Sequence, residues 1–389
     1  MKEWFNKIPV QEMIEWRRHI HENPELSFEE FKTSAFVEEK LRSFGNIEIE
    51  KPVGTSVLGI IKGAKEGKTI LLRADMDALP MQEEGDLPFR SKVEKVAHTC
   101  GHDTHTAMLL ATAKVLSEMR DELHGTVKLI FQHAEEKEPG GATQIIETGV
   151  LNDVDAVVGL HIIPNLEAGS IHIHKEGAAT TAADGFFLNI QGKGSHGSMP
   201  QNGVDPIIVG TQIINQLQTV VSRYVTPGEL AVISVGEFKA GDAPNIIPDK
   251  AYMSASIRTV NEETRNKIEQ RVKDIIDNVC KTYGATYDLN YIKSYMAVIN
   301  DADLSQLVMD SAKEVLGEEM VHAAPMTSAS EDFSYYQRIA PECFVILGGG
   351  TAEEGCGFAN HHPKFMIKEE AMEAGVKTEV QAVLNFLNA

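Results

Sequence analysis

The segment with the clearest potential for chemistry carries a cysteine two positions before a histidine. It reads Thr-Cys-Gly-His-Asp-Thr-His-Thr from Thr99 to Thr106. In an extended segment, residues two apart point to the same side, so the thiolate of Cys100 and the imidazole of His102 can face one metal ion. Gly101 between them lets the backbone bend around that ion. A catalytic Cys–His couple or a reduced core cysteine would give the same local pattern, so the rest of the chain has to decide.

This Cys–His pair is expected at a strand-to-helix turn. Asp103 is of a type that often caps helices, and apolar residues from Ala107 to Met119 follow helical spacing. Turns of this kind at the ends of strands are where α/β enzymes place their chemistry.

Further candidate metal ligands lie at the ends of other expected elements. Glu135 and Glu136 directly follow one expected strand, His161 follows the next, and His361 lies near the C-terminal end. Because the carboxyl ends of parallel strands meet at one edge of a sheet, these distant segments can share a site. A mixture of thiolate, imidazole and carboxylate suits Zn²⁺, Co²⁺, Ni²⁺ or Mn²⁺ better than Ca²⁺ or Mg²⁺.

The adjacent acids Glu135 and Glu136 suggest a mechanism. Adjacent side chains diverge, so one carboxylate can bind a metal while the other faces a bound water, whose pKa a metal lowers to about 7. Lys137 and Glu138 continue the run of charges. On the residues alone, a solvated acidic loop therefore remains the alternative.

Length, composition and charge limit the number of domains, the location and the binding partners that we expect. At 389 residues the chain suits two domains, and 42% hydrophobic with 24% charged residues is ordinary for a soluble globular protein. No apolar run long enough for a membrane span, no secretory leader and only four scattered cysteines are apparent, so we expect a cytoplasmic protein that does not enter a membrane. A net charge of −21 argues against binding to nucleic acids or anionic membranes.

The order of elements predicts one domain inserted into another. Outer segments at 1–180 and 295–389 alternate helices with strands, expected at 56–61, 69–74, 126–132, 156–160 and 343–347, which indicates a largely parallel mixed sheet flanked by helices. Between them, residues 181–294 follow the order βαββαβ, typical of an α+β ferredoxin-like domain.

Several sequence blocks, in order along nearly the whole chain, carry a family resemblance. They are Arg17–Ser27, Arg73–Pro80, Cys100–His105, Gly159–His161, Gly192–Gly197, Ser330–Phe333 and His361–Phe365. A chain with these blocks resembles the cocatalytic-metal aminoacylase/carboxypeptidase family. Within it, the resemblance is to the amidohydrolase branch of hippurate hydrolases, N-acetyl-amino-acid deacetylases and auxin-conjugate hydrolases.

The resemblance implies two divalent transition-metal ions in each subunit. Cys100 would bridge them, in the place where most relatives use an aspartate. His102 and His161 would hold one ion, and Glu136 and His361 would hold the other.

The resemblance also implies roles for three further acids. Glu135 would be the general base, and Asp77 would orient a metal ligand from outside the first coordination sphere. Asp75 stands where other branches have a metal-binding histidine, and we place it outside the coordination sphere as well.

The inserted domain would be a lid that also forms a homodimer. His196 matches the histidine that reaches the active site of the partner subunit and polarises the scissile carbonyl. Asn245 and Arg258 match positions that grip the carbonyl and carboxylate of the substrate, and a guanidinium suits a carboxylate because it forms two parallel hydrogen bonds. From the residues alone, His196 could equally be a surface-loop histidine and Arg258 an ordinary strand arginine.

Together these features predict a metal-dependent amidohydrolase that cleaves N-acyl amino acids into a carboxylic acid and a free amino acid. Metal-bound water would attack the amide, with Glu135 taking its proton and passing it to the leaving amine. The alternatives are a dipeptidase or carboxypeptidase, a cysteine hydrolase that uses Cys100 as the nucleophile, and a catalytically silent metal-binding module.

Overall fold

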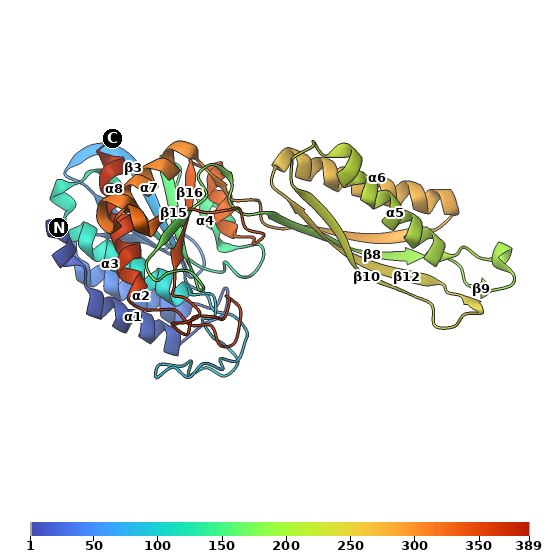
Figure 1. The fold of residues 1–389 in the computed structure, drawn as a ribbon, viewed down its shortest axis with the longest axis horizontal. Coiled ribbons are helices and arrows are strands. Elements are labelled where there is room, and N and C mark those ends of the chain that lie inside the picture. Colours follow the sequence, from blue (N-terminus) through green and yellow to red (C-terminus); the bar gives the residue numbers. More distant parts are fainter. Residues whose placement is uncertain (1, 389) are drawn as a thin grey trace. The chain divides into compact units, whose positions relative to one another are not determined.

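The computed structural model describes residues 2–388, which divide into two compact units (Figure 1). The outer unit contains the described residues up to Ala179, Ile299–Pro325 and those from Asp332 onward. The inserted unit contains Thr180–Val298 together with Met326–Glu331.

The outer unit is built on a ten-stranded mixed sheet whose main path runs β1-β2-β4-β3-β5-β16-β14-β7. Neighbours from β4 to β14 pair in parallel, while β2 runs antiparallel to β4, so the prediction of a largely parallel sheet is confirmed. The strands are β1 (Glu48–Glu50), β2 (Val57–Lys62), β3 (Lys65–Asp75), β4 (His124–Gln132), β5 (Ala156–Ile163), β6 (Ile171–Ile173), β7 (Gly177–Ala178), β14 (Ile299–Asn300), β15 (Val321–Ala323) and β16 (Glu342–Gly348).

Helices cover this sheet because its central strands are continuous apolar runs rather than alternating ones. Helix α3 contacts β3, β5, α1, α2 and α8, and all its residues except Lys114 and Glu118 are buried. Helices α7 and α8 lie side by side (Figure 1). The α-helices of the outer unit are α1 (Val10–Glu22), α2 (Phe31–Phe44), α3 (His102–Glu118), α4 (Gly141–Glu147), α7 (Ala302–Leu316) and α8 (Ala371–Leu387). Its 3₁₀ turns are η1 (Glu3–Lys7), η2 (Arg120–Glu122), η4 (Glu318–Met320) and η5 (Asp332–Arg338).

The start of α3 differs from the sequence-based expectation. The cap is Gly101, with φ of 94°, and Asp103 lies inside the first turn. Its Oδ2 accepts hydrogen bonds from Nε of Arg17 at 3.0 Å and Nδ1 of His21 at 2.9 Å. Burial alone would raise the pKa of Asp103, but Arg17 and His21 outweigh that effect and hold the pKa well below its usual range. The carboxylate of Asp103 therefore binds two residues of α1 and does not cap its own helix.

The inserted unit has a four-stranded antiparallel sheet in the order β10-β12-β8-β13. Helices α5 and α6 lie side by side on one face of it (Figure 1), and alternate residues of β8 from Phe186 to Ile190 are buried beneath them. The elements are β8 (Ala182–Gln191), β9 (Ser195–His196), η3 (Pro200–Asn202), α5 (Pro206–Tyr224), β10 (Ala231–Ala240), β11 (Ile246–Ile247), β12 (Lys250–Thr259), α6 (Glu262–Tyr283) and β13 (Thr286–Lys293). Strands β9 and β11 form a separate two-stranded ribbon.

A buried ion pair lies where the first and last strands of the inserted unit meet. Asp184 on β8 accepts hydrogen bonds from the guanidinium of Arg265 on α6, with Nη2–Oδ1 at 2.6 Å, and from the backbone N–H of Ser294. Asp184 also pairs with Lys293 across β8 and β13. The two ends of the insertion therefore lie next to each other.

One short segment departs from the expected domain boundaries of 181–294. Residues 326–331, expected in the outer domain, group with the inserted unit, as do Thr180 and the residues up to Val298. The reason is hydrogen bonding: Thr181 N–H donates to the carbonyl of Ala329 at 3.1 Å, and Val298 N–H donates to Oγ1 of Thr180 at 3.0 Å.

A buried glutamate on α8 makes stability depend on pH. The hydroxyl of Thr112 donates to Oε2 of Glu379 at 2.6 Å, and burial raises the pKa of Glu379 to about 7. The folded state thus holds this proton more tightly than the unfolded chain, so the free energy of unfolding falls as pH rises from about 4.5 to above 7. We expect Glu379→Gln to be more stable than the wild type at pH 8, by roughly 1–3 kcal/mol, and nearly equal at pH 4.5.

Urea unfolding at the two pH values tests this expectation. Glu373→Gln, at a half-exposed position of the same helix, is the control. Parallel pH dependence in the wild type and Glu379→Gln would contradict the assignment.

Candidate metal centre

Five side chains that the sequence predicted as metal ligands converge at the carboxyl edge of the outer sheet. Cys100 precedes α3, whose first residue is His102. Glu136 follows β4, and His161 lies within β5, which extends three residues beyond the expected end at residue 160. His361 comes from the loop between β16 and α8.

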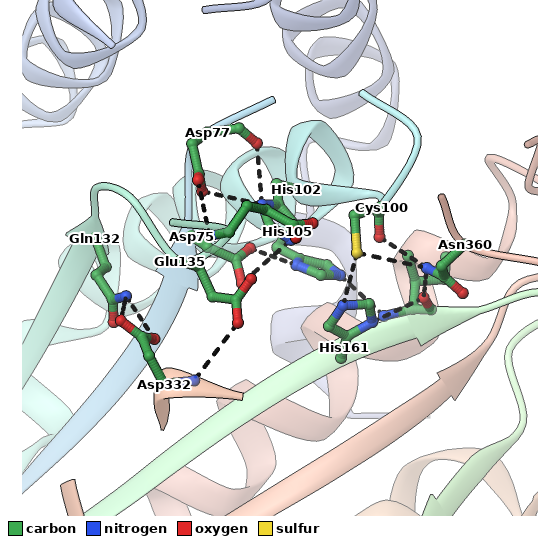
Figure 2. A network of polar contacts seen from close by, with 12 residues as sticks. Asp75, Asp77, Cys100, His102, His105, Gln132, Glu135, His161, Asp332 and Asn360 are labelled. Atoms are coloured by element: carbon green, nitrogen blue, oxygen red, sulfur yellow. Dashed lines mark hydrogen bonds and ion pairs between the residues drawn. The ribbon is translucent and has the colours of Figure 1, made fainter. Parts of the chain in front are cut away.

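The ligand atoms of these residues fall into two overlapping groups. In each group, the atoms lie within 4.8 Å of one another: Cys100, His102 and His161 form one group, and Cys100, Glu136 and His361 form the other. Sγ of Cys100 lies 3.4 Å from Nε2 of His161, and the two side chains face each other in Figure 2. Nε2 of His361 lies 3.0 Å from Oε1 of Glu136. Cys100 is common to both groups, which is the placement a bridging ligand requires.

Two buried polar atoms of the cluster have no hydrogen-bond partner within residues 2–388. They are Nε2 of His102 and Oε1 of Glu136, which lie 3.8 Å apart; this oxygen also faces Nε2 of His361 at 3.0 Å, without hydrogen-bond geometry. Buried polar atoms are nearly always satisfied, and a nitrogen and an oxygen that converge without a hydrogen bond are placed as ligands of a cation. The residues therefore fit a divalent transition metal.

The charges around the cluster favour metal binding over a nucleophilic cysteine. Burial raises the pKa of the Cys100 thiol well above its usual value, and the carboxylates of Glu136 and Glu135 raise it further. Reactive cysteines have the opposite shift, caused by nearby positive charge. Burial lowers the pKa of His161 well below its usual value, so its imidazole is neutral, as a ligand must be.

The carboxylates around His102 have the opposite effect on that histidine. Burial lowers the pKa of His102, but Asp75, Asp77 and Glu136 outweigh burial and raise it to about 10. Without metal, a proton therefore occupies this imidazole, and a cation that binds here displaces it. Metal affinity should consequently increase with pH.

Asp77 contacts the candidate ligand His102 from outside the cluster. Its Oδ1 lies 3.2 Å from Nδ1 of His102, and its Oδ2 accepts the backbone N–H of Glu136 at 3.0 Å and the hydroxyl of Ser27 at 2.6 Å. One carboxylate thus orients an imidazole and also holds the backbone of a second candidate ligand.

Asp75 contacts His105; the sequence left a supporting role for this histidine open, beside a purely structural one, but indicated no partner for it. Nε2 of His105 accepts the backbone N–H of Ile162 at 2.9 Å, so Nδ1 carries the proton and donates to Asp75 at 2.6 Å (Figure 2). The only signal for this contact was the position of His105 one helical turn after His102. The Asn360 side chain, also missed, donates to the carbonyl of Cys100 at 2.9 Å.

Glu135 lies beside the candidate ligands and is almost completely buried. Its carboxylate is within 4.8 Å of the ligand atoms of His102 and Glu136, and Oε1 lies 3.5 Å from the backbone nitrogen of Asp332 (Figure 2). The two adjacent acids therefore reach the same centre, which a solvated loop would not achieve.

The inserted unit brings together two of its three candidate residues. Nδ1 of His196 accepts the backbone N–H of Ser198 at 3.2 Å, so the neutral ring carries its proton on Nε2. Asn245 lies alongside, because its carbonyl accepts the N–H of Gly197 at 2.8 Å. Arg258 lies far from both, near the other end of β12, where it pairs with Ala183.

Comparison with known proteins gives the family. Residues 71–385 match the peptidase family M20/M25/M40. The chain belongs to this family. It is therefore a hydrolase of amide bonds, and the family resemblance predicted from the sequence blocks is confirmed.

Individual relatives cover most of the chain. An N-acyl-L-amino acid amidohydrolase of Geobacillus stearothermophilus is 45% identical over 289 residues, which are 74% of this chain and 78% of the relative. Thermostable carboxypeptidase 2 of Saccharolobus solfataricus is 40% identical over 98% of both chains. The crystal structure of the YXEP protein of Bacillus subtilis, described as a dinuclear metal binding peptidase, matches with a TM-score of 0.84 and 35% identity over 98% of both chains.

Within residues 2–388, every helix is too short or too polar to span a bilayer.

We expect Cys100→Ala to lose metal, because the substitution removes the one side chain common to both ligand groups. Elemental analysis of the purified variant should give clearly less than two ions per chain under conditions that load the wild type. Cys343→Ala, which removes a buried thiol near Ser305, is the control and should load normally. Full occupancy of two ions in Cys100→Ala would exclude the bridging role.

Proposed function

We propose that this M20 member hydrolyses the amide bond of N-acyl amino acids, such as N-acetyl or aroyl amino acids, with two divalent transition-metal ions per subunit. The observation that carries the proposal is the convergence of two ligand groups on Cys100, with the buried carboxylate of Glu135 beside them. His102 and His161 would hold one ion, and Glu136 and His361 the other. The name of the Geobacillus relative supports this substrate class. Zn²⁺, Mn²⁺, Co²⁺ and Ni²⁺ all suit the donor set.

Glu135 would act as the general base and then as the general acid. Bound ions of this kind polarise a carbonyl and make water more acidic. The Glu135 carboxylate takes a proton from the attacking water and afterwards delivers it to the nitrogen of the leaving amine. Its burial supports this role, because a carboxylate removed from bulk water keeps the proton close to the reacting atoms.

His196, Asn245 and Arg258 would bind the substrate, with His196 donating from Nε2 to the developing oxyanion. His196 and Asn245 lie beyond one end of strand β12, where Lys250 pairs with Gln191. Arg258 lies near the other end of the strand, where it pairs with Ala183. The separation is roughly 26 Å along the strand, longer than an N-acyl amino acid. One lid therefore cannot offer all three side chains to the same small substrate.

A homodimer formed through the inserted units would allow all three side chains to reach one substrate. Strand β10 is an edge strand, paired only with β12 among the described residues, and its Val232 is exposed. Two copies related by a two-fold axis would place their β10 strands antiparallel. The Arg258 end of one lid would then lie next to the His196 end of the other. We accordingly propose that the partner subunit's lid completes each active site.

A dipeptidase or carboxypeptidase is the second candidate, favoured by the similarity to thermostable carboxypeptidase 2. Both activities would use the same metal centre and differ in the group that the substrate carries on the carbonyl side of the scissile amide, an acyl group in one case and an aminoacyl group in the other. A direct comparison of kcat/KM for N-acetyl amino acids, N-benzoyl amino acids and unblocked dipeptides separates them. We propose a cytoplasmic location, since all four cysteines are buried and free of disulfides.

We expect Glu135→Gln to reduce kcat for an N-acetyl amino acid by about 10²-fold or more, because the base is lost. Metal content should stay normal, because Glu135 is not one of the proposed ligands. Steady-state kinetics with elemental analysis measures both quantities, and Glu138→Gln, at an exposed acid of the same loop, is the control. Near-normal turnover of metal-loaded Glu135→Gln would exclude the base assignment.

We expect His196→Ala to lower turnover by roughly 10²-fold while metal content stays normal, because one donor to the oxyanion is lost. Mixing it with Glu135→Gln tests whether His196 acts across subunits. In a heterodimer, one site would combine an intact Glu135 with the partner's intact His196, and the other would carry both defects.

Heterodimers isolated with two different affinity tags should therefore regain part of the wild-type activity. Homodimers of each parent, taken through the same exchange, are the controls. Heterodimers as inactive as both parents would show that His196 does not act across the interface.

A further inference from the structure

The loop that carries Glu135 and Glu136 begins with an unfavourable backbone conformation. Strand β4 ends at Gln132, and Ala134 follows with φ of +50°, in the left-handed region that residues other than glycine rarely adopt. Ala134 is completely buried. Such a conformation persists only where the surrounding structure fixes it.

Three hydrogen bonds fix this turn from both sides of Glu135. The backbone N–H of Ala134 donates to Oε1 of Glu30 at 2.8 Å, and the carbonyl of Ala134 accepts from Gly141 N–H at 3.1 Å. The N–H of Glu136 donates to Oδ2 of Asp77 at 3.0 Å. The direction in which the Glu135 side chain points therefore depends on two carboxylates that come from other parts of the chain.

Glu30 is an unusual group to find in this place. Its exposed fraction is 0%, and within residues 2–388 no Lys, Arg or His lies at ion-pair distance from it. Neutral donors satisfy it instead: Phe28 N–H shares Oε1 at 3.0 Å, and the Thr55 hydroxyl donates to Oε2 at 2.6 Å. Burying a carboxylate without a cation is costly, so these hydrogen bonds must offset that cost and hold Glu30 firmly against Ala134.

The contacts of Glu30 separate its role from that of Asp77. Asp77 also touches His102, so its loss would disturb a candidate metal ligand directly. Glu30 bonds to Ala134, Phe28 and Thr55, none of which is a candidate ligand.

We propose that Glu30 is a positioning residue for catalysis: by holding Ala134 in its left-handed turn, it sets the orientation of Glu135. The inference rests on the proposed function of Glu135 as the base.

Two substitutions of Glu30 test the proposal in metal-loaded full-length protein. Glu30→Ala leaves Ala134 N–H without its acceptor, so kcat should fall about tenfold or more while KM and metal content change little. Glu30→Gln keeps an oxygen for Ala134 and Phe28 and turns its amide toward the Thr55 hydroxyl, so it should retain kcat within about threefold of the wild type. If Gln is as impaired as Ala, or Ala is as active as the wild type, the proposal is wrong.

A double-mutant cycle distinguishes positioning of Glu135 from general destabilisation. In the Glu135→Gln background, Glu30→Ala should reduce the residual kcat less than threefold, because the group it orients is already lost. The control is Glu342→Ala, which removes another buried glutamate that accepts a backbone N–H, from Ile299 at 3.0 Å. It should lower thermal stability but leave kcat unchanged. Equal losses for Glu30→Ala in both backgrounds would overturn the proposal.

Two further outcomes keep the test decisive. If Glu135→Gln retains wild-type kcat, the proposed function fails, whatever Glu30 does. If Glu30→Ala does not fold, Glu30→Asp takes its place, since its shorter side chain withdraws the carboxylate from Ala134 N–H while keeping the charge. A threefold or larger fall in kcat with normal metal content would support the proposal, and an unchanged kcat would refute it.

Discussion

Repulsion among buried carboxylates is the constraint on which the organisation of this site depends. Asp75, Asp77, Glu135 and Glu136 approach one another at the carboxyl edge of the outer sheet, where little water screens their charges. Such a group is stable only if positive charge or hydrogen-bond donors meet every member. The cations and hydrogen-bond donors around the site each compensate part of this negative charge.

The compensation is divided among several kinds of donor. The guanidinium of Arg73, fully buried, joins Asp75 to Asp332, with Nη2 2.9 Å from Asp332. The imidazoles of His102 and His105 meet Asp77 and Asp75, and backbone N–H groups meet Asp77 and Glu30. The carboxylate of Glu136 faces Cys100 and the unpartnered Nε2 of His102. Divalent ions bound between these side chains would balance the negative charge that remains. Metal binding and local folding are thus parts of one electrostatic arrangement.

The features that could be predicted from the sequence are those with a local signal. The buried strands β4 and β5 are apolar runs, so the acids and histidine at their ends could be assigned to one sheet edge. The order of elements in the inserted unit follows from alternating and helical periodicities. The Cys100–His102 spacing likewise lies within a few residues of chain.

Features that depend on distant partners could not be predicted. Asp103 has the type of a helix cap, but Arg17 and His21 engage it from another helix, and Gly101 caps α3 instead. Glu30 and Ala134 are 104 positions apart, and nothing near either residue indicates their bond. Strands of two or three residues, such as β14 and β15, are too short to show any periodicity. Residues 326–331 group with the inserted unit, where Thr181 donates from its backbone to Ala329 and from its hydroxyl to the carbonyl of Ser328.

The adjacency of the two ends of the insertion bears on how such an enzyme can diversify. Because Asp184 binds both Arg265 and the backbone of Ser294, the main segment of the inserted unit begins and ends at nearly the same place. The inserted unit also has its own apolar core. An exchange of this module for another with adjacent ends would leave the strand order of the outer sheet unchanged. Replacement of the whole inserted unit would therefore leave all five candidate metal ligands in place, because they belong to the outer unit.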